Sequence, residues 1–407
     1  MAIETYWPDA ATQAEFARRA EEAGRSNPAF WNALPTLPAR PVDGHKGTFG
    51  TALCVGGSRG MSGAISLTGS AALVAGAGLT RLFVPDSILE TVAGFAREYT
   101  TIPGACDASG RLTSAALEAV LTEAANATAV AVGPGFGRSA EATRLVVELF
   151  FELERPAVFD ADALNALAEA GVFDEETETP KKRGLAEENE AAKENEKSEK
   201  EKNGSETNGP SRRFVGRKPR GVRILTPHPG EFARLTGAKP SSDRTGRIDA
   251  ALAFAERLER LFGDAAKCWN EDGAEAQVAR RKELSVGAPD GGSAFVVVLK
   301  GAGTVVANGD GALCVNETGN PSLATGGSGD VLTGIIVGLL AQGAAPFDAT
   351  RSAVALHGLA ADLRSTRLAR GAVASDVVRF LPFAFDFYEA SQASARLRDD
   401  VEKRRKV

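Results

Sequence analysis

Residues 326–330, Gly-Gly-Ser-Gly-Asp, combine little side-chain bulk with one acidic group. Glycine and serine let backbone N–H groups turn outward and converge, as they do in many phosphate-binding loops. The apolar run at 331–340 predicts a helix that begins near Gly329, and its N-terminus adds the positive end of the helix dipole. Asp330 is then an anion beside an anion site. That placement makes chemical sense if Asp330 takes a proton from a hydroxyl that attacks the phosphate.

A simpler interpretation of the same five residues is a turn followed by a helix N-cap, because serine and aspartate are common caps. A short motif alone does not decide between the two interpretations. The decision rests on where the other glycine-rich and polar segments of the chain lie relative to the predicted strands.

Most of those segments follow short apolar runs with strand character. The runs are residues 51–55, 81–85, 128–132, 156–160, 222–227 and 295–299. Helical segments at 64–77, 114–125 and 141–154 lie between them. This alternation predicts an α/β fold whose mostly parallel central sheet is covered by helices on both faces. Since the carboxyl ends of parallel strands meet at one edge, we expect the ligand site there.

The C-terminal third has a different pattern. Two strand-like runs flank Asn308-Gly309, which is a hairpin signal. The 331–340 helix is apolar nearly all round and is therefore predicted to be buried. A second helix is predicted at 348–363, with Asp348 as its N-cap, and a final helix from 374 to about Pro382.

Composition limits the possible functions. The chain has 407 residues, 43% of them apolar, enough for a sizeable core. A net charge of −6 argues against a nucleic-acid partner. No apolar stretch is long enough to span a bilayer, and the N-terminus has no secretory pattern, so we expect no membrane association. The widely spaced Cys54, Cys106, Cys268 and Cys314 are typical of reduced thiols in a cytoplasmic protein.

The chain divides into a main domain at 41–382, a leader at 1–40 with helical spacing at 11–23, and a solvated helical tail at 383–407. Two insertions are predicted within the main domain. Residues 174–220 are highly charged and nearly free of apolar side chains, so we expect disorder there. Residues 264–292 have the composition of a loop insertion.

Seven motifs occur in order along the main domain. They are Lys46-Gly47-Thr48-Phe49-Gly50, Gly56-Gly57-Ser58 with Ser62-Gly63-Ala64, Gly133-Pro134-Gly135, Asp160-Ala161-Asp162-Ala163-Leu164-Asn165, Thr226-Pro227-His228-Pro229-Gly230-Glu231, Lys300-Gly301-Ala302-Gly303-Thr304 and Ala324-Thr325-Gly326-Gly327-Ser328-Gly329-Asp330. Together they resemble the ADP-dependent NAD(P)H-hydrate dehydratase family of the ribokinase-like superfamily. The resemblance covers roughly 41–382, interrupted by the two insertions. It implies a three-layer α/β/α sandwich.

The resemblance also implies a repair activity. Such enzymes return the S epimer of NAD(P)H hydrate to NAD(P)H at the expense of ADP, with ATP as a possible substitute and Mg²⁺ as a cofactor. A nucleotide phosphorylates the ring hydroxyl, and the phosphate then leaves. Relatives often form tetramers, and many carry an epimerase domain. Because 1–40 is too short for such a domain, we expect a separate epimerase.

Residue roles follow from the resemblance position by position. Asp330 matches the catalytic base and a substrate contact. Ala64, Gly135 and His228 match contacts to the hydrated dinucleotide. Glu231 lies where related kinases carry the last residue of Asn-x-x-Glu, a magnesium and phosphate motif, but His228 replaces its asparagine.

The nucleotide and its phosphate have their own matching positions. The backbone N–H groups of Gly327, Ser328 and Gly329 match the anion hole for the transferred phosphate. Gly329 also belongs to the nucleotide-binding set. The rest of that set is Lys300, Gly301, Ala302, Gly303 and Thr304.

Several assignments stay open on the sequence alone. Lys300 also fits a surface lysine, and Asp160 and Asp162 fit helix caps as well as site residues. His357 fits a packed core histidine better than a ligand, and the role of His45 is undecided. For the whole protein, the alternatives are a thiazole or hydroxymethylpyrimidine kinase type of enzyme and a non-catalytic nucleotide-binding regulator.

Overall fold

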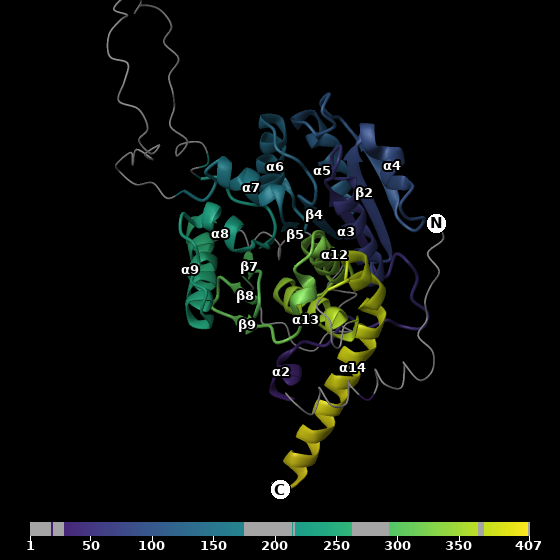
Figure 1. The fold of residues 1–407 in the computed structure, drawn as a ribbon, viewed down its shortest axis with the longest axis vertical. Coiled ribbons are helices and arrows are strands. Elements are labelled where there is room, and N and C mark those ends of the chain that lie inside the picture. The colour runs from purple at the N-terminus through teal and green to yellow at the C-terminus, as the bar shows by residue number, and fades with distance from the viewer. Residues whose placement is uncertain are drawn as a thin grey trace, which may run out of the picture.

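The computed structural model describes residues 18, 28–174, 214, 216–262, 293–364 and 370–405. They form a nine-stranded sheet with the order β3-β2-β1-β4-β5-β6-β7-β8-β9 (Figure 1). Strands β1 to β7 are parallel, and β8 and β9 are antiparallel at one end. The predicted mostly parallel α/β sheet is confirmed.

The strands are short, and most are buried. They span Thr51–Val55 (β1), Leu79–Pro85 (β2), Thr100–Gly104 (β3), Ala129–Val132 (β4), Ala157–Phe159 (β5), Arg223–Leu225 (β6), Phe295–Leu299 (β7), Val305–Asn308 (β8) and Leu313–Val315 (β9). All the predicted runs form strands, but β3 is absent from the predicted set. Its sequence, Thr-Thr-Ile-Pro-Gly, includes a proline, which a sheet tolerates at an edge, where β3 lies.

Helices cover both faces of the sheet, and successive strand residues alternate between two cores. Ala52 and Cys54 of β1 face one core, while Leu53 and Val55 face the other. The first layer consists of α2 (Pro28–Ala33), α3 (Ser62–Val74), α4 (Leu89–Ala93), α12 (Ser328–Ala341), α13 (Pro346–Arg364) and α14 (Ala374–Arg405). The second consists of α5 (Leu117–Ala125), α6 (Ala140–Glu152), α7 (Asp162–Glu169), α8 (Pro229–Thr236) and α9 (Arg244–Phe262).

Helix α12 packs unusually close to α3. Gly334 and Gly338 of α12 face the α3 backbone, and a Cβ added at Gly334 would lie 2.3 Å from the carbonyl oxygen of Thr68. The hydroxyl of Thr68 donates in turn to the carbonyl oxygen of Asp330 at 3.1 Å. The small residues of α3 therefore let the helix that carries the phosphate motif sit directly on the helix that follows β1.

One helical prediction needs correction, and one long helix was not predicted. Asp348 is not an N-cap, because α13 begins at Pro346 and Asp348 lies in its first turn. Helix α9 is absent from the predicted set, although Arg247, Ala251, Phe254 and Leu258 repeat on its buried face with helical spacing.

The C-terminal helix does not end at about Pro382. Helix α14 continues through this proline, and Phe387 and Tyr388 are buried beyond it. The hydroxyl of Tyr388 lies 2.9 Å from that of Ser352 in α13. Residues just after 382 thus belong to the packed body and not to a solvated tail, because their aromatic side chains contribute to the core.

Part of the predicted leader also contributes to the core. Trp31 of α2 is buried against Phe387 and Tyr388 of α14, with ring centroids 5.6 and 6.2 Å apart. The Nε2 of Gln392 donates to the carbonyl oxygens of Leu34 and Pro35 at 2.9 and 2.7 Å. Apart from residue 18, the helix predicted at 11–23 lies outside the described residues.

The insertions lie mainly outside the described residues as well. The described end of the charged insertion packs on the body: the Phe214 ring stacks on Phe151, and Arg217 pairs with Glu148 and Glu152 of α6. The insertion boundary at 220 is therefore too late. Within the described ranges, no helix has the length and apolar character needed to cross a membrane.

Replacing Gly334 with alanine is expected to lower the free energy of unfolding by about 1–3 kcal/mol, because the new methyl group would collide with α3. Gly63→Ala is the matched control, since Gly63 is also helical but an added Cβ there meets nothing within 4 Å. Urea unfolding measures both variants. Equal stability of the two would contradict the need for close approach between α12 and α3.

Candidate active site

Five parallel strands end at one edge of the sheet, and a predicted motif follows each of them. Residues 56–58 follow β1, the 133–135 motif follows β4, Asp160 follows β5, Thr226 follows β6 and Lys300 follows β7. Helix α12 begins at the same edge. The sheet therefore gathers most of the motifs in one place. Residues 46–50 are the exception: they precede β1 and lie at the opposite edge, where a Cβ on Gly50 would meet the carbonyl oxygen of Ala341 at the end of α12.

Helix α12 presents an open backbone N-terminus at this edge. It begins at Ser328 after Gly327, whose φ of 87° is left-handed, and no side chain caps it. A Cβ on Gly327 would lie 2.6 Å from Cδ1 of Leu67, so both conformation and space favour glycine. The turn-and-cap interpretation of the motif is therefore wrong, since neither Ser328 nor Asp330 caps the helix.

The first N–H groups of α12 are available to a ligand. The N–H of Ser328 donates to the carbonyl of Thr325 at a long 3.4 Å, and that of Val331 donates to Gly327 at 3.1 Å. Within the described part of the chain, the N–H groups of Gly329 and Asp330 make no hydrogen bond. Unpaired amides at a helix N-terminus favour an anion.

Lys300 is not the surface lysine considered above, because its side chain is only 18% exposed. Its Nζ donates to Oδ1 of Asp160 at 2.6 Å and lies 3.8 Å from Oε2 of Glu231. Oδ2 of Asp160 accepts a hydrogen bond from the hydroxyl of Thr333 in α12 at 2.8 Å. The ends of β5 and β7 and the helices α8 and α12 thus meet around a single buried ammonium group.

Asp160 and Lys300 hold each other ionised. Burial alone would raise the pKa of Asp160. The charge and hydrogen bond of Lys300, together with hydrogen bonds from Thr226 and Thr333, outweigh burial, so the pKa lies below its usual value. Burial alone would lower the pKa of Lys300, but Asp160 and then Glu231 raise it above its usual value. The lysine therefore carries its positive charge at neutral pH.

Asp330 lies in the first turn of α12, partly buried. Burial, reinforced by the negative charge of Asp160, raises its pKa to about 6, although Lys300 acts in the opposite direction. The carboxyl is mostly ionised at pH 7 and has a higher proton affinity than an ordinary aspartate. Both properties suit a general base that accepts a proton from a hydroxyl.

His228 begins α8 and points a half-exposed ring toward solvent. Its Nδ1 accepts the N–H groups of Gly230 and Glu231 at 2.9 and 3.2 Å, so a neutral ring carries its proton on Nε2. Burial, followed by the positive charge of Lys300, lowers the pKa of His228. The ring is thus a neutral group at pH 7 whose exposed face remains free for a ligand.

Glu231 completes this capping box by accepting the backbone N–H of His228 at 2.8 Å. The side chain is buried, and burial raises its pKa to about 7 even though Lys300 lowers it. Among the described residues, no group of three or more His, Cys, Asp or Glu side chains could hold a metal ion. A metal ion bound at Glu231 would therefore have a single protein carboxylate as a ligand.

The 300–304 loop is supported from beneath and open outward. Arg247 of α9 donates through Nη2 to the carbonyl oxygens of Leu299 and Lys300 at 2.9 and 3.3 Å. The hydroxyl of Thr304 donates to the carbonyl of Gly301 at 2.8 Å. The segment 301–303 is exposed. These supports hold the loop in shape while leaving its outer side accessible.

Two predicted substrate contacts lie together at the other end of the edge. Gly135 has a left-handed φ of 63°, and an added Cβ would lie 3.0 Å from Cβ of Ala64 and 2.5 Å from the carbonyl oxygen of Met61. The hydroxyl of Ser58 donates to the Gly135 carbonyl at 2.9 Å. The loops after β1 and β4 are therefore fastened to each other beside α3.

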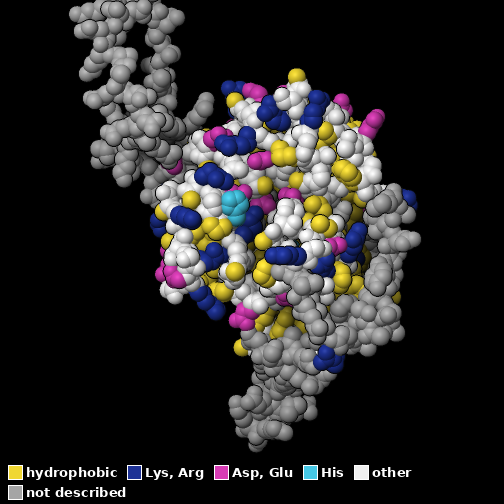
Figure 2. All heavy atoms as spheres, viewed as in Figure 1, with side chains coloured by type: hydrophobic (Ala, Val, Ile, Leu, Met, Phe, Trp, Pro, Cys, Tyr) yellow, Lys and Arg dark blue, Asp and Glu magenta, His cyan; other side chains and the backbone are white. Residues whose placement is uncertain are grey.

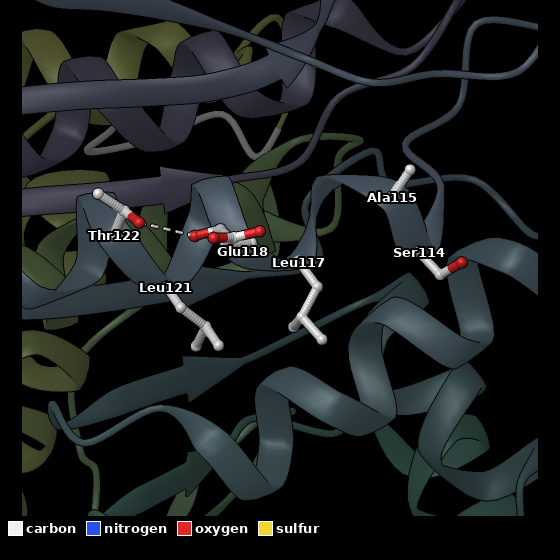
Figure 3. Close-up of a pocket in the computed structure, with 6 residues that line it drawn as sticks. All are labelled: Ser114, Ala115, Leu117, Glu118, Leu121 and Thr122. Atoms are coloured by element: carbon white, nitrogen blue, oxygen red, sulfur yellow. Dashed lines mark hydrogen bonds between the residues drawn. The ribbon is translucent and has the colours of Figure 1, made fainter.

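The surface view agrees with a mixed-charge site. Figure 2 shows a histidine side chain in the region of α8 with acidic and basic side chains around it. A separate hollow lies along α5 (Figure 3) and contains a single carboxylate. It is lined by Ser114, Ala115, Leu117, Glu118, Leu121 and Thr122. None of these residues belongs to the motifs at the strand ends, so the hollow is not part of the candidate active site.

Comparison with known proteins agrees with this geometry. A family model described as NAD(P)H-hydrate dehydratase matches residues 52–185 and 212–382. The chain belongs to the NAD(P)H-hydrate dehydratase family. It is 36% identical to the ADP-dependent (S)-NAD(P)H-hydrate dehydratase of Neisseria meningitidis over 348 residues, which is 83% of this chain and 86% of that protein.

Other members of the dehydratase family are longer. The chain is 35% identical to the bifunctional NAD(P)H-hydrate repair enzyme Nnr of Moorella thermoacetica over 348 residues, covering 85% of this chain and 51% of that protein. It therefore spans about half the length of such bifunctional relatives.

Solved structures confirm the fold. An ADP/ATP-dependent NAD(P)H-hydrate dehydratase from Bacillus subtilis, co-crystallised with ATP and Mg²⁺, is 27% identical, with a TM-score of 0.57 over 90% of this chain and 97% of that chain. A ribokinase-like superfamily protein from Enterococcus faecalis, at 19% identity, shares the fold with a TM-score of 0.56 over 90% of this chain and 95% of that chain.

The structure adds several groups to the candidate active site that the sequence left open or did not include. Asp160 is not a helix cap but a buried partner of Lys300, and Thr333 has no motif signal at all. His357 is the buried core histidine that was expected, yet its Nε2 lies 3.2 Å from the Ser328 hydroxyl. His45 accepts the N–H of Gly47 in an exposed turn. Only three-dimensional proximity reveals the roles of Asp160, Thr333 and His357.

The carboxyl group of Asp330 is expected to titrate with a pKa of about 6, because burial and Asp160 favour its neutral form. Carbon-13 NMR of the aspartate carboxyl carbons measures this value, and Asp330→Asn assigns the signal. Asp107 is an internal comparison, since hydrogen bonds from Arg111 hold its pKa below the usual value. An Asp330 signal that titrates together with Asp107 would contradict the electrostatic description of the site.

Proposed function

We propose that the chain repairs damaged nicotinamide nucleotides by dehydrating the S epimer of NAD(P)H hydrate to NAD(P)H at the expense of ADP, giving AMP and phosphate. The observation that carries this proposal is the position of Asp330. It combines a raised pKa with a place in the first turn of α12, beside unpaired backbone amides. The similarity to the Neisseria protein, which covers most of both chains, supports this substrate.

The first step is phosphoryl transfer. Asp330 takes the proton of the ring hydroxyl, whose oxygen attacks the terminal phosphorus of ADP, and the bond from that phosphorus to the AMP oxygen breaks. The N–H groups at the start of α12, assigned to Gly327, Ser328 and Gly329, stabilise the charge on the transferred group. Lys300, ionised and facing the same turn, adds a positive charge.

The second step is elimination. Hydroxide is a poor leaving group at neutral pH, whereas phosphate is a good one. The lone pair of the adjacent ring nitrogen expels the phosphate, and a proton then leaves the neighbouring ring carbon to restore the reduced ring. We assign Ala64, Gly135 and His228 to hold the hydrated dinucleotide beside Asp330. We assign Lys300, Gly301, Ala302, Gly303, Thr304 and Gly329 to hold ADP.

Mg²⁺ fits this site only with help from the nucleotide. Oε2 of Glu231 already accepts the N–H of His228, which leaves too few protein oxygens for a closed cage. Magnesium is commonly held by one or two carboxylates plus substrate phosphates, and Glu231 would be that carboxylate. The ion would neutralise phosphate charge. ATP is a possible alternative phosphate donor.

By the same resemblance, we place the protein in the cytoplasm as a homotetramer that works with a separate NAD(P)H-hydrate epimerase. The other half of the bifunctional relatives supports the link to a second repair step. Light scattering of the purified chain measures the assembly. A monomer would contradict the tetramer without affecting the proposed reaction.

The activity is tested by incubating the S hydrate with ADP, and separately with ATP, and following the near-ultraviolet absorbance of the reduced nicotinamide ring. With ADP as the phosphate donor, we expect the absorbance to return and one AMP to form for each reduced nicotinamide ring restored. If the absorbance does not recover, and the chain phosphorylates a thiazole or hydroxymethylpyrimidine supplied with ATP in a parallel assay, it is instead a small-molecule kinase. Nucleotide binding without any turnover would indicate a regulator.

Asp330→Asn is expected to retain ADP binding and to lose most of the turnover, by roughly 10²–10⁴-fold, because the amide cannot accept the hydroxyl proton. Calorimetry with ADP and the absorbance assay separate the two properties. Full activity of this variant would show that another group is the base.

A further inference from the structure

Asp160 is a buried carboxylate that the phosphoryl-transfer step does not use directly. Both of its oxygens are engaged: Oδ1 accepts from Lys300 at 2.6 Å and Oδ2 from Thr333 at 2.8 Å. Lys300 is 140 residues away and Thr333 is 173 residues away along the chain. Asp160 therefore joins the end of β5 to the end of β7 and to the second turn of α12.

The backbone around Asp160 is held in an unusual state. The next residue, Ala161, has a φ of 52°, the one positive φ of a non-glycine residue among those described. Such a conformation is unfavourable for a residue with a side chain and persists where the surroundings enforce it. A Cβ on Gly133 would lie 1.9 Å from the carbonyl oxygen of Asp160, so the neighbouring β4 loop also passes unusually close. Strain and close approach together fix the position of this carboxylate.

The group that Asp160 holds faces the start of α12. A Cβ built on Gly329 would lie 3.3 Å from Nζ of Lys300 and 3.5 Å from Oδ2 of Asp160. The ammonium has three N–H donors. One goes to Asp160, and Glu231 at 3.8 Å is beyond hydrogen-bond distance. Donors therefore remain for an anion at the helix N-terminus.

We propose that Asp160 is a positioning residue, which together with Thr333 fixes the ammonium of Lys300 over the first turn of α12 so that it meets the phosphoryl group being transferred. This role rests on the proposed function for its chemical step, but not for ADP binding. Because Lys300 and Thr333 engage both oxygens of Asp160, this carboxylate acts through Lys300. No motif assignment in the sequence gives it this task.

A second consequence concerns the base. Asp330 is surrounded by the charges of Asp160, Asp162 and Lys300, and Asp160 raises its pKa. Removing the charge of Asp160 should therefore make Asp330 a weaker base that ionises at lower pH. This effect separates Asp160 from Thr333, because Thr333 contributes a hydrogen bond but no charge.

The test compares Asp160→Asn, Thr333→Val, Lys300→Met and the Asp160→Asn/Lys300→Met double variant. Asp160→Asn keeps the shape of the side chain, and we expect kcat to fall about 10- to 100-fold, as for loss of a hydrogen bond to a charged group. Thr333→Val should lower kcat by a smaller factor, about 3- to 10-fold. Glu148→Gln is the matched control: it removes the ion pair with Arg217 outside the site, so kcat and the Kd of ADP should not change.

Two readouts distinguish positioning from a merely structural role. In the Lys300→Met background, Asp160→Asn should cause little further change in the calorimetric Kd of ADP, or in kcat at a pH at which Asp330 is fully ionised, because Asp160 then acts through the lysine. The acid limb of kcat/KM should move to lower pH in Asp160→Asn and stay in place in Thr333→Val. Losses that simply multiply, or that appear only in the melting temperature, would overturn the proposal.

The design also separates this proposal from the function on which it rests. If the wild-type chain does not dehydrate the hydrate, the proposed function fails. The ADP affinities of the four variants still test Asp160, since they need no turnover, and a wild-type Kd in Asp160→Asn would overturn its role. If the wild-type chain is active and folded Asp160→Asn has unchanged kcat and Kd, the positioning role fails while the function stands.

Discussion

The ammonium of Lys300, buried between the carboxylates of Asp160 and Glu231, is the interaction on which the geometry of the site depends. Removing a charge from water costs several kcal/mol, and close opposite charges offset that cost only when the geometry is good. The 2.6 Å contact with Asp160 meets this condition. Because the three residues follow different strands, satisfying their charges also determines how the strand ends are arranged.

The second constraint is the close approach of α12 and α3. Gly334 lets the backbones come together, and Thr68 ties α3 to the carbonyl of Asp330. The position of the α12 N-terminus is therefore set by packing along the helix and not by a cap. An uncapped start leaves amides for a ligand, which a side-chain cap would occupy. Helix α12 thus combines close packing through Gly334 with an open N-terminus after Gly327.

The three carboxyl groups of the site differ in pKa and therefore in the roles that they can take. Asp160, beside Lys300, has a pKa below its usual value, while Asp330 has a pKa of about 6 and Glu231 of about 7. All three carboxyl groups face the same lysine, so distance and burial decide the difference. The group closest to Lys300 stays ionised and holds structure. Asp330, at the N-terminus of α12, is farther from the positive charge of Lys300 and retains the proton affinity that a base needs.

The sheet, the order of the motifs and the edge at which most of them meet can be predicted from the amino-acid sequence. These features depend on local patterns: apolar runs of strand length, glycine and polar residues directly after them, and helices between. Strand β3 was not predicted, because a short edge strand with a proline lacks that pattern. The family likewise followed from the seven motifs, since each is a local signal and their order is visible in the chain.

Which side chains act together in the site depends on contacts between residues far apart in the sequence. Asp160 and Lys300 are 140 residues apart, and neither the burial of the pair nor the contact with Thr333 has a local signature. The path of α14 beyond Pro382 depends in the same way on Trp31 near the opposite end of the chain. Composition and spacing report what a segment can do. The partners of charged and aromatic side chains are determined only when folding sets the distances between them and removes water from around them.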